Sequence, residues 1–145
     1  AINSFRAPRF SRDSALRSVR KMIGTIQANA KRLKVLHSRI NETFQKRDNS
    51  EKELNEWKQA CERFHAEYDT LAFPGGLELG IKRIKEGHMP TIQSGLIYLE
   101  NTPYCFRSQY VAKDIKRALN KVELPDQLAE RFTTYKQSKK PNQSQ

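Results

Sequence analysis

The chain of 145 residues is poor in the features that mark several large classes of protein. No apolar run approaches the ~18 residues that a membrane span needs, and the opening sequence AINSFRAPRF lacks the apolar core of a secretory signal. Two cysteines are too few for a disulfide framework, which favours a reduced protein. We therefore expect a cytoplasmic protein without a membrane partner.

Recognisable catalytic patterns are also missing from the sequence. The chain has no glycine-rich phosphate loop, no serine in a nucleophile elbow and no carboxylate pair on an apolar face. We therefore expect no cofactor and no catalytic activity. A small all-α enzyme is kept as an alternative, because scattered arginine and glutamate side chains can assemble a site across an oligomer.

Glycine and proline are scarce, at six residues each, and most of them lie between segments of helical periodicity. No stretch alternates apolar and polar residues as a half-buried strand does. The sequence therefore predicts an all-α fold.

The strongest helical pattern lies in the N-terminal third, over residues 12–46. Residues suited to a seam between helices recur at alternating spacings of three and four: Leu16, Val19, Ile23, Ile26, Ala30, Leu33, His37, Ile40 and Phe44. This repeat is typical of a coiled coil, in which one stripe of a helix faces a partner helix.

A second helix of the same kind is predicted over residues 50–72. Ser50 and Glu53 follow a polar turn and have the spacing of a capping box. The seam residues of this helix are Leu54, Trp57, Cys61, Phe64, Tyr68 and Leu71. Because a short turn makes two such helices antiparallel, we expect Leu33 to lie opposite Phe64.

Four shorter helices are predicted after a Pro-Gly-Gly boundary at residues 74–76. They are residues 77–86, a helix starting at Pro90, residues 103–122, and a helix starting at Pro125. The expected organisation is a flexible basic arm (1–11), a coiled-coil-like helical hairpin (12–73), a short-helix region packed on the hairpin (74–137) and a disordered tail (138–145).

The two helices of the hairpin differ in length. At ~1.5 Å per residue the first spans ~50 Å and the second only ~35 Å. The N-terminal end of the first helix, with Leu16, Val19 and Ile23, therefore lacks a partner in the hairpin. We expect the C-terminal helices, or a second copy of the chain, to cover these side chains.

Positive charge is concentrated near the N-terminus. The net charge of the chain is +11, with +10 in residues 1–47, −4 in residues 48–73 and +5 in residues 74–145. The heptad places the basic residues of the first helix on its outer face, where Glu56 and Glu62 of the second helix cannot easily reach them. An unneutralised basic stripe of this kind suits contact with a phosphate backbone.

We therefore predict nucleic-acid contact through the arm and this outer face. In the arm, Phe5-Arg6 and Arg9-Phe10 place aromatic rings beside guanidinium groups, a pairing that can stack on bases and meet phosphates. The candidate residues are Arg6, Arg9, Arg17, Lys31, Arg32, Arg39 and Lys46. Simple solubility and an acidic protein partner are alternative explanations of the same charge.

A secondary candidate surface combines aromatic and basic residues: Tyr104, Phe106, Arg107 and Lys113. The functional interpretation is an aromatic and basic recognition surface. The alternative is that Tyr104 and Tyr110 or Val111 belong to the core while Phe106 caps a helix junction, because aromatic residues at helical spacing are usually core.

A third constellation consists of His37, Cys61 and His65. The register brings these three possible zinc ligands into one layer of the hairpin. The sequence contains no Cys-x-x-Cys or His-x-x-x-His pair, however, and a polar residue at a seam position more often fixes the register or the partner of a coiled coil. No metal site is therefore expected.

The sequence as a whole favours a non-catalytic, basic helical binding protein. We interpret it as a small subunit or accessory of a nucleic-acid-handling assembly. The alternative from a different class is a structural or protein-interaction subunit that docks a partner, or a further copy of the chain, through its hairpin.

Overall fold

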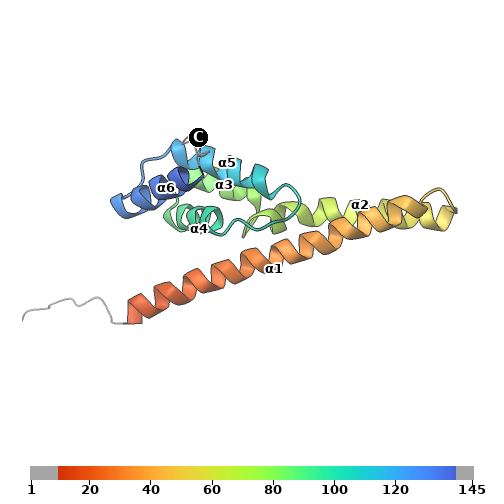
Figure 1. Ribbon diagram of the computed structural model, residues 1–145, viewed down its shortest axis with the longest axis horizontal. Coiled ribbons are helices and arrows are strands. Elements are labelled where there is room, and N and C mark those ends of the chain that lie inside the picture. The colour runs from red at the N-terminus through yellow and green to blue at the C-terminus, as the bar shows by residue number, and fades with distance from the viewer. Residues whose placement is uncertain (1–9, 140–145) are drawn as a thin grey trace, which may run out of the picture.

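The computed structural model describes residues 10–139, and all regular structure in that range is helical. The helices are α1 (Phe10–Lys46), α2 (Glu51–Ala72), α3 (Leu77–Lys85), α4 (Met89–Glu100), α5 (Ser108–Asn120) and α6 (Asp126–Ser138). Figure 1 shows α1 and α2 as a long antiparallel hairpin, with α3 to α6 gathered along one side. The predicted fold class, a helical hairpin packed against four short helices, is confirmed.

The turn of the hairpin ends in the predicted capping box. Ser50 is the N-cap of α2, and its Oγ accepts a hydrogen bond of 3.1 Å from the backbone N–H of Glu53. This bond satisfies one of the free N–H groups at the start of the helix. The reversal of the chain is therefore fixed by local chemistry.

The predicted register of the hairpin is confirmed at its centre. Leu33 (1% exposed) and Phe64 (6% exposed) belong to one buried cluster together with Leu36. Tyr68 and Ile40 pack against the same cluster. The hairpin thus has a second buried cluster, and Tyr68 packs against both this cluster and the main core.

The buried face of α1 is wider than the predicted seam. Leu36 and Thr43, one residue before His37 and Phe44, are both buried, whereas Phe44 is 45% exposed. A helix in a globular protein buries three or four positions in each heptad, not only the two of a strict coiled coil. Thr43 is accommodated because its hydroxyl donates to the carbonyl oxygen of Arg39 (2.7 Å).

The main core lies among the short helices and is centred on α4. Leu96 of α4 is fully buried, as are Ile84 of α3 and Ile115 of α5. Ile26 of α1 joins the same cluster, so α1 contributes to both cores. In Figure 1, α4 is the short helix that lies along α1.

Three of the short helices begin close to the predicted residues, but α5 does not. We expected a helix from residue 103, because Thr102-Pro103 has the pattern of a helix start. Instead, residues 101–107 form a loop and α5 begins at Ser108. The backbone of Arg107 is left-handed (φ 60°), which is incompatible with a continuous right-handed helix.

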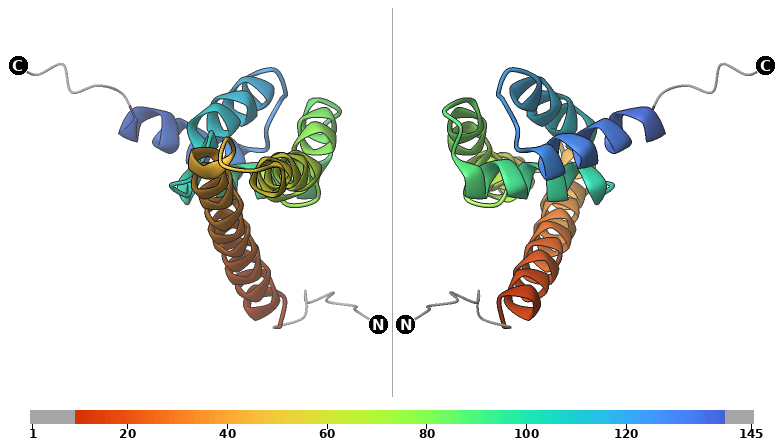
Figure 2. Two further views of the ribbon diagram at one scale, coloured as in Figure 1. Left: turned by 90° about the vertical axis from the view of Figure 1, so that its right-hand side faces the viewer. Right: turned by 90° about the vertical axis from the view of Figure 1, so that its left-hand side faces the viewer.

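The N-terminal end of α1 extends beyond the rest of the described structure. Leu16 is 51% exposed and Val19 is 36% exposed, while Ile23 is half-buried against the main core. Cover by the short helices is therefore wrong for Leu16 and Val19, while the other half of the expectation, cover by a second copy of the chain, stays a prediction. Figure 2 shows the reason: α1 runs obliquely away from the short helices toward its N-terminal end.

The predictions for the two ends of the chain fall largely outside the described residues. Most of the predicted arm (1–11) and tail (138–145) lies outside the described residues, although α1 already begins at Phe10 and α6 continues to Ser138. Within residues 10–139, no helix combines the length and the apolar character that crossing a bilayer requires.

Candidate functional site

The loop between α4 and α5 is attached to the hairpin by one aromatic side chain. The ring of Phe106 lies 4.5 Å from the ring of His37 in α1 and 5.3 Å from the ring of Phe64 in α2, measured between centroids. The ring of Tyr68 is a third neighbour at 6.4 Å. Phe106 therefore joins the loop to both helices of the hairpin.

Two other aromatic side chains at this loop face solvent. Tyr104 is 86% exposed, and Tyr110, in the first turn of α5, is 67% exposed. Val111, by contrast, is buried in the main core. Of the residues that the sequence offered as core here, Val111 alone occupies the core, while both tyrosines are surface residues.

Arg107 lies between Phe106 and the start of α5, and its backbone makes the hydrogen bonds that begin this helix. Its carbonyl oxygen accepts hydrogen bonds from the N–H groups of Tyr110 (3.0 Å) and Val111 (3.1 Å). Its left-handed φ of 60° is unusual for a residue with a side chain, and such strain persists only where the surrounding structure enforces it. The guanidinium carbon lies 5.2 Å from the centre of the Phe106 ring.

These residues surround an open hollow of about 410 Å³ where the loop meets α1. The hollow is lined by Lys34 and His37 from α1 and by residues 104–110. None of the described residues that line it is acidic, while Lys34 and Arg107 are basic. An anion in the hollow therefore meets positive charge from both sides.

A second hollow, of about 380 Å³, continues the first along the outer face of α1. It is lined by Lys31, Lys34, Val35, Ser38, Arg39 and Glu42, so that Lys34 borders both hollows. We use the name loop–helix surface for the lysine, arginine and exposed tyrosine side chains of the two hollows, leaving out Arg39 because it lies 3.9 Å from Glu42: Lys31, Lys34, Tyr104, Arg107 and Tyr110.

Part of the predicted basic stripe of α1 is neutralised by α2. Arg32 forms two hydrogen bonds with the carboxylate of Glu67 in α2, at 3.2 and 3.3 Å. The expectation that α2 cannot neutralise this residue is therefore wrong. Arg32 is adjacent to the seam residue Leu33, and its side chain is long enough to cross the edge of the hairpin to a glutamate further along α2.

The other predicted candidates are distributed over several places. Arg39 lies 3.9 Å from Glu42 in its own helix, where both side chains are more than half exposed. Arg17 is on the extended end of α1 and Lys46 is at the turn of the hairpin, both away from the loop–helix surface. Arg6 and Arg9 lie outside the described residues.

The secondary surface and the stripe of α1, predicted as separate features, meet in the structure. Tyr104, Phe106 and Arg107 all line the hollow that contains Lys34, whereas Lys113 is exposed on α5 outside it. Sequence reasoning missed Lys34 as a site residue. Its spacing of three from both Lys31 and His37 could have placed it on their face of the helix, but not beside the loop.

Cys105 lies in the same loop and is half-buried. Burial raises the pKa of its thiol above the ordinary value, and this effect outweighs the opposing influence of the Ser108 hydrogen bond and of nearby Lys34. The thiol is therefore protonated at neutral pH, and a protonated thiol is a poor nucleophile and a poor metal ligand.

The zinc layer considered for the hairpin does not form. Within residues 10–139, no three histidine, cysteine, aspartate or glutamate side chains gather in a way that could hold a metal ion. The ring of His37 lies against the rings of Phe106 and Phe64 instead. His37 therefore contributes its ring to the contact between the hairpin and the loop.

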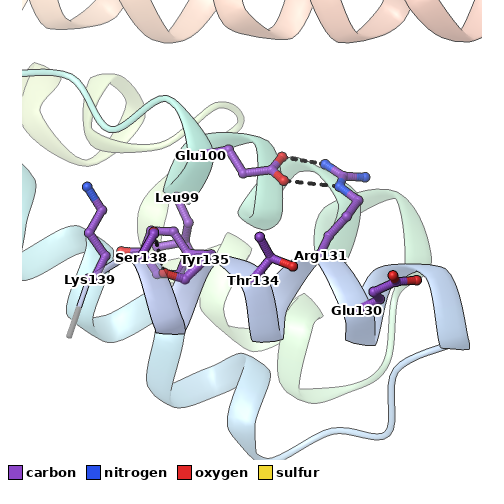
Figure 3. A pocket seen from close by; sticks show the side chains of 8 residues that line it. All are labelled: Leu99, Glu100, Glu130, Arg131, Thr134, Tyr135, Ser138 and Lys139. Atoms are coloured by element: carbon purple, nitrogen blue, oxygen red, sulfur yellow. Dashed lines mark hydrogen bonds and ion pairs between the residues drawn. The ribbon is translucent and has the colours of Figure 1, made fainter.

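A separate hollow of about 390 Å³ lies between α4 and α6, and its lining residues are drawn in Figure 3. Arg131 binds the carboxylate of Glu100 there, with Nε to Oε2 at 3.1 Å, and the hydrogen-bonded carboxylate raises the pKa of the guanidinium. Glu130 adds a further acid to the lining. Since the charges of this hollow largely cancel, it is a weaker candidate for anion binding.

The loop–helix surface thus combines cations that suit phosphate groups with exposed rings that suit stacking. A fold alone does not define a function, so these side chains carry the functional argument. Comparisons of the chain with protein-family models, with curated proteins and with solved structures find no match.

Proposed function

We propose that this chain is a nucleic-acid-binding protein that contacts the phosphate backbone through the loop–helix surface, as an accessory subunit of a nucleic-acid-handling assembly. The observation that carries the proposal is the hollow in which Lys34 of α1 faces Arg107, Tyr104 and Tyr110. Two segments separated by about seventy residues of sequence supply the cations and the rings.

The charge of the surface supports an anionic ligand with several phosphates. Lys31 and Lys34 lie almost one turn apart on α1, and Arg107 of the loop lines the same hollow as Lys34. Each cation that meets a phosphate releases condensed counterions, which makes binding favourable at low salt. The excess charge of the chain, +11 in total, raises the rate of encounter with any polyanion.

A protein partner is the second candidate, and one observation favours it. Leu16 and Val19 form an exposed apolar pair on the extended end of α1. Apolar side chains that are left uncovered at helical spacing suit a partner helix. Binding through this pair would persist at high salt, whereas phosphate contact would not.

The proposal is tested by titrating a fluorescent oligonucleotide with the full chain and measuring anisotropy at several salt concentrations. The double substitution Lys31→Glu with Lys34→Glu should abolish most of the binding. The matched control is Lys52→Glu with Lys58→Glu on the exposed surface of α2, which changes the net charge equally. No binding at low salt, or equal losses in the two double variants, would contradict a site at the loop–helix surface.

A further inference from the structure

We infer that the loop–helix surface prefers single-stranded over double-stranded nucleic acid, with unpaired bases stacking on Tyr104 and Tyr110 while phosphates lie against Lys34 and Arg107. This inference rests on the proposed function and specifies its ligand class.

The exposure of the two tyrosines is the first observation. Tyr104 is 86% exposed and Tyr110 is 67% exposed, while Phe106, between them in sequence, is packed on the hairpin. Neither tyrosine belongs to a buried cluster. Their rings are consequently available as flat surfaces on which another ring can stack.

The backbone that carries these rings is held in place by its neighbours. Phe106 anchors the loop on one side of Arg107, and the carbonyl oxygen of Arg107 binds the N–H of Tyr110 on the other side (3.0 Å). A preformed arrangement loses less conformational freedom on binding than a free loop would. The strained backbone of Arg107 fits a segment whose geometry serves recognition.

Stacking on a side chain requires a base with a free face. In a duplex, the faces of each base are covered by the neighbouring base pairs, and single strands or splayed loops are the usual partners of exposed aromatic residues. The hollow also has cations from two segments, Lys34 on α1 and Arg107 on the loop, which suits the phosphates of a strand that lies along it.

The test compares two probes, an oligothymidylate of about 12 nucleotides and a DNA duplex of similar length. We expect the full chain to bind the single strand more tightly. Replacing both tyrosines, Tyr104→Ala with Tyr110→Ala, should weaken single-strand binding roughly 10-fold or more and weaken duplex binding by a clearly smaller factor. The control Tyr104→Phe with Tyr110→Phe keeps both rings and should keep the preference.

Circular dichroism melting establishes that each variant is folded, which we expect because both side chains are exposed. Equal affinity of the unchanged protein for the two probes would overturn the inference, as would full single-strand affinity in the double alanine variant. Both of these results leave salt-sensitive binding in place, so the proposed function would survive them. Failure of the proposed function is a different result, in which neither probe binds at low salt.

Discussion

The ring of His37 lies 4.5 Å from the ring of Phe106, centroid to centroid, and this contact connects the hairpin with a loop near residue 105. His37 and Phe106 are each only half-buried, and neither belongs to the main core. The contact nevertheless sets where Arg107 and Tyr104 lie relative to α1. The candidate binding site is therefore a product of tertiary packing between two segments.

Truncation of Leu33 should destabilise the hairpin strongly. Leu33→Ala removes a side chain that is 1% exposed and packs with Phe64, and we expect a loss of about 2–5 kcal/mol in the free energy of unfolding. Val35→Ala, at a position of the same helix that is 56% exposed, should change stability by only about 0.5 kcal/mol or less. Urea denaturation measures both; similar losses would contradict the register.

Two glycines should respond to alanine in opposite directions. A Cβ at Gly80 of α3 would lie 2.6 Å from an atom of the Phe73 ring, which is 1% exposed and cannot easily move. At Gly24 of α1 a Cβ would meet nothing within 4 Å. We expect Gly80→Ala to lower the melting temperature and Gly24→Ala to stabilise by about 0.5–1 kcal/mol, because alanine favours helix.

Removing the partner of Arg32 should strengthen nucleic-acid binding. Glu67→Gln frees the guanidinium of Arg32 at a cost in stability of about 1 kcal/mol or less, because both side chains are substantially exposed. One additional phosphate contact would raise affinity by up to about fivefold at low salt. Glu62→Gln makes the same change of charge at an exposed site of α2, and it should have a smaller effect in the same anisotropy titration.

Stability should fall at alkaline pH, in part because of Tyr98. Burial raises the pKa of this tyrosine, which is 3% exposed, so the folded chain holds the phenol proton more tightly than the unfolded chain. The contribution of Tyr98 to the free energy of unfolding is complete below pH ~10, the ordinary pKa of tyrosine. It is lost progressively as the pH rises above this value, because the unfolded chain then releases the proton first.

Melting temperatures measured between pH 8 and about 11 should therefore decline less steeply in Tyr98→Phe than in the unchanged protein. Tyr104→Phe removes a phenol hydroxyl at the surface and serves as the control. Identical slopes in all three proteins would show that Tyr98 makes no contribution. Burial also raises the pKa of Tyr68, so part of the slope should persist in Tyr98→Phe.

Those features of the fold that depend on short-range patterns were predictable from the sequence. The 3,4 spacing identified both helices of the hairpin and paired Leu33 with Phe64, and the capping box located the start of α2. Such signals work because one turn of helix brings residues three and four apart onto the same face.

Features that depend on distant segments were not predictable in the same way. The ion pair of Arg32 with Glu67 depends on side chains that cross the edge of the hairpin. Lys34 and the loop at residues 101–107 lie side by side because of the way α4 and α5 pack. Thr102-Pro103 also misled the prediction of α5, because the left-handed residue Arg107 carries no distinctive sequence signal.

Tertiary packing covers the C-terminal part of α1 but not its N-terminal turns, so the two parts of this continuous helix should differ in local stability. Amide hydrogens near Leu33 belong to turns whose inner face is buried, with Ala30, Leu33 and Leu36 all in the interior, and they should exchange with solvent only when the whole chain unfolds. Amide hydrogens near Leu16 belong to helical turns that have few tertiary neighbours. These turns are too short to be stable as an isolated helix. Gly24, between them and the packed part of α1, weakens the helix further because glycine disfavours helical structure. These turns can therefore fray and re-form while the hairpin and the main core stay intact.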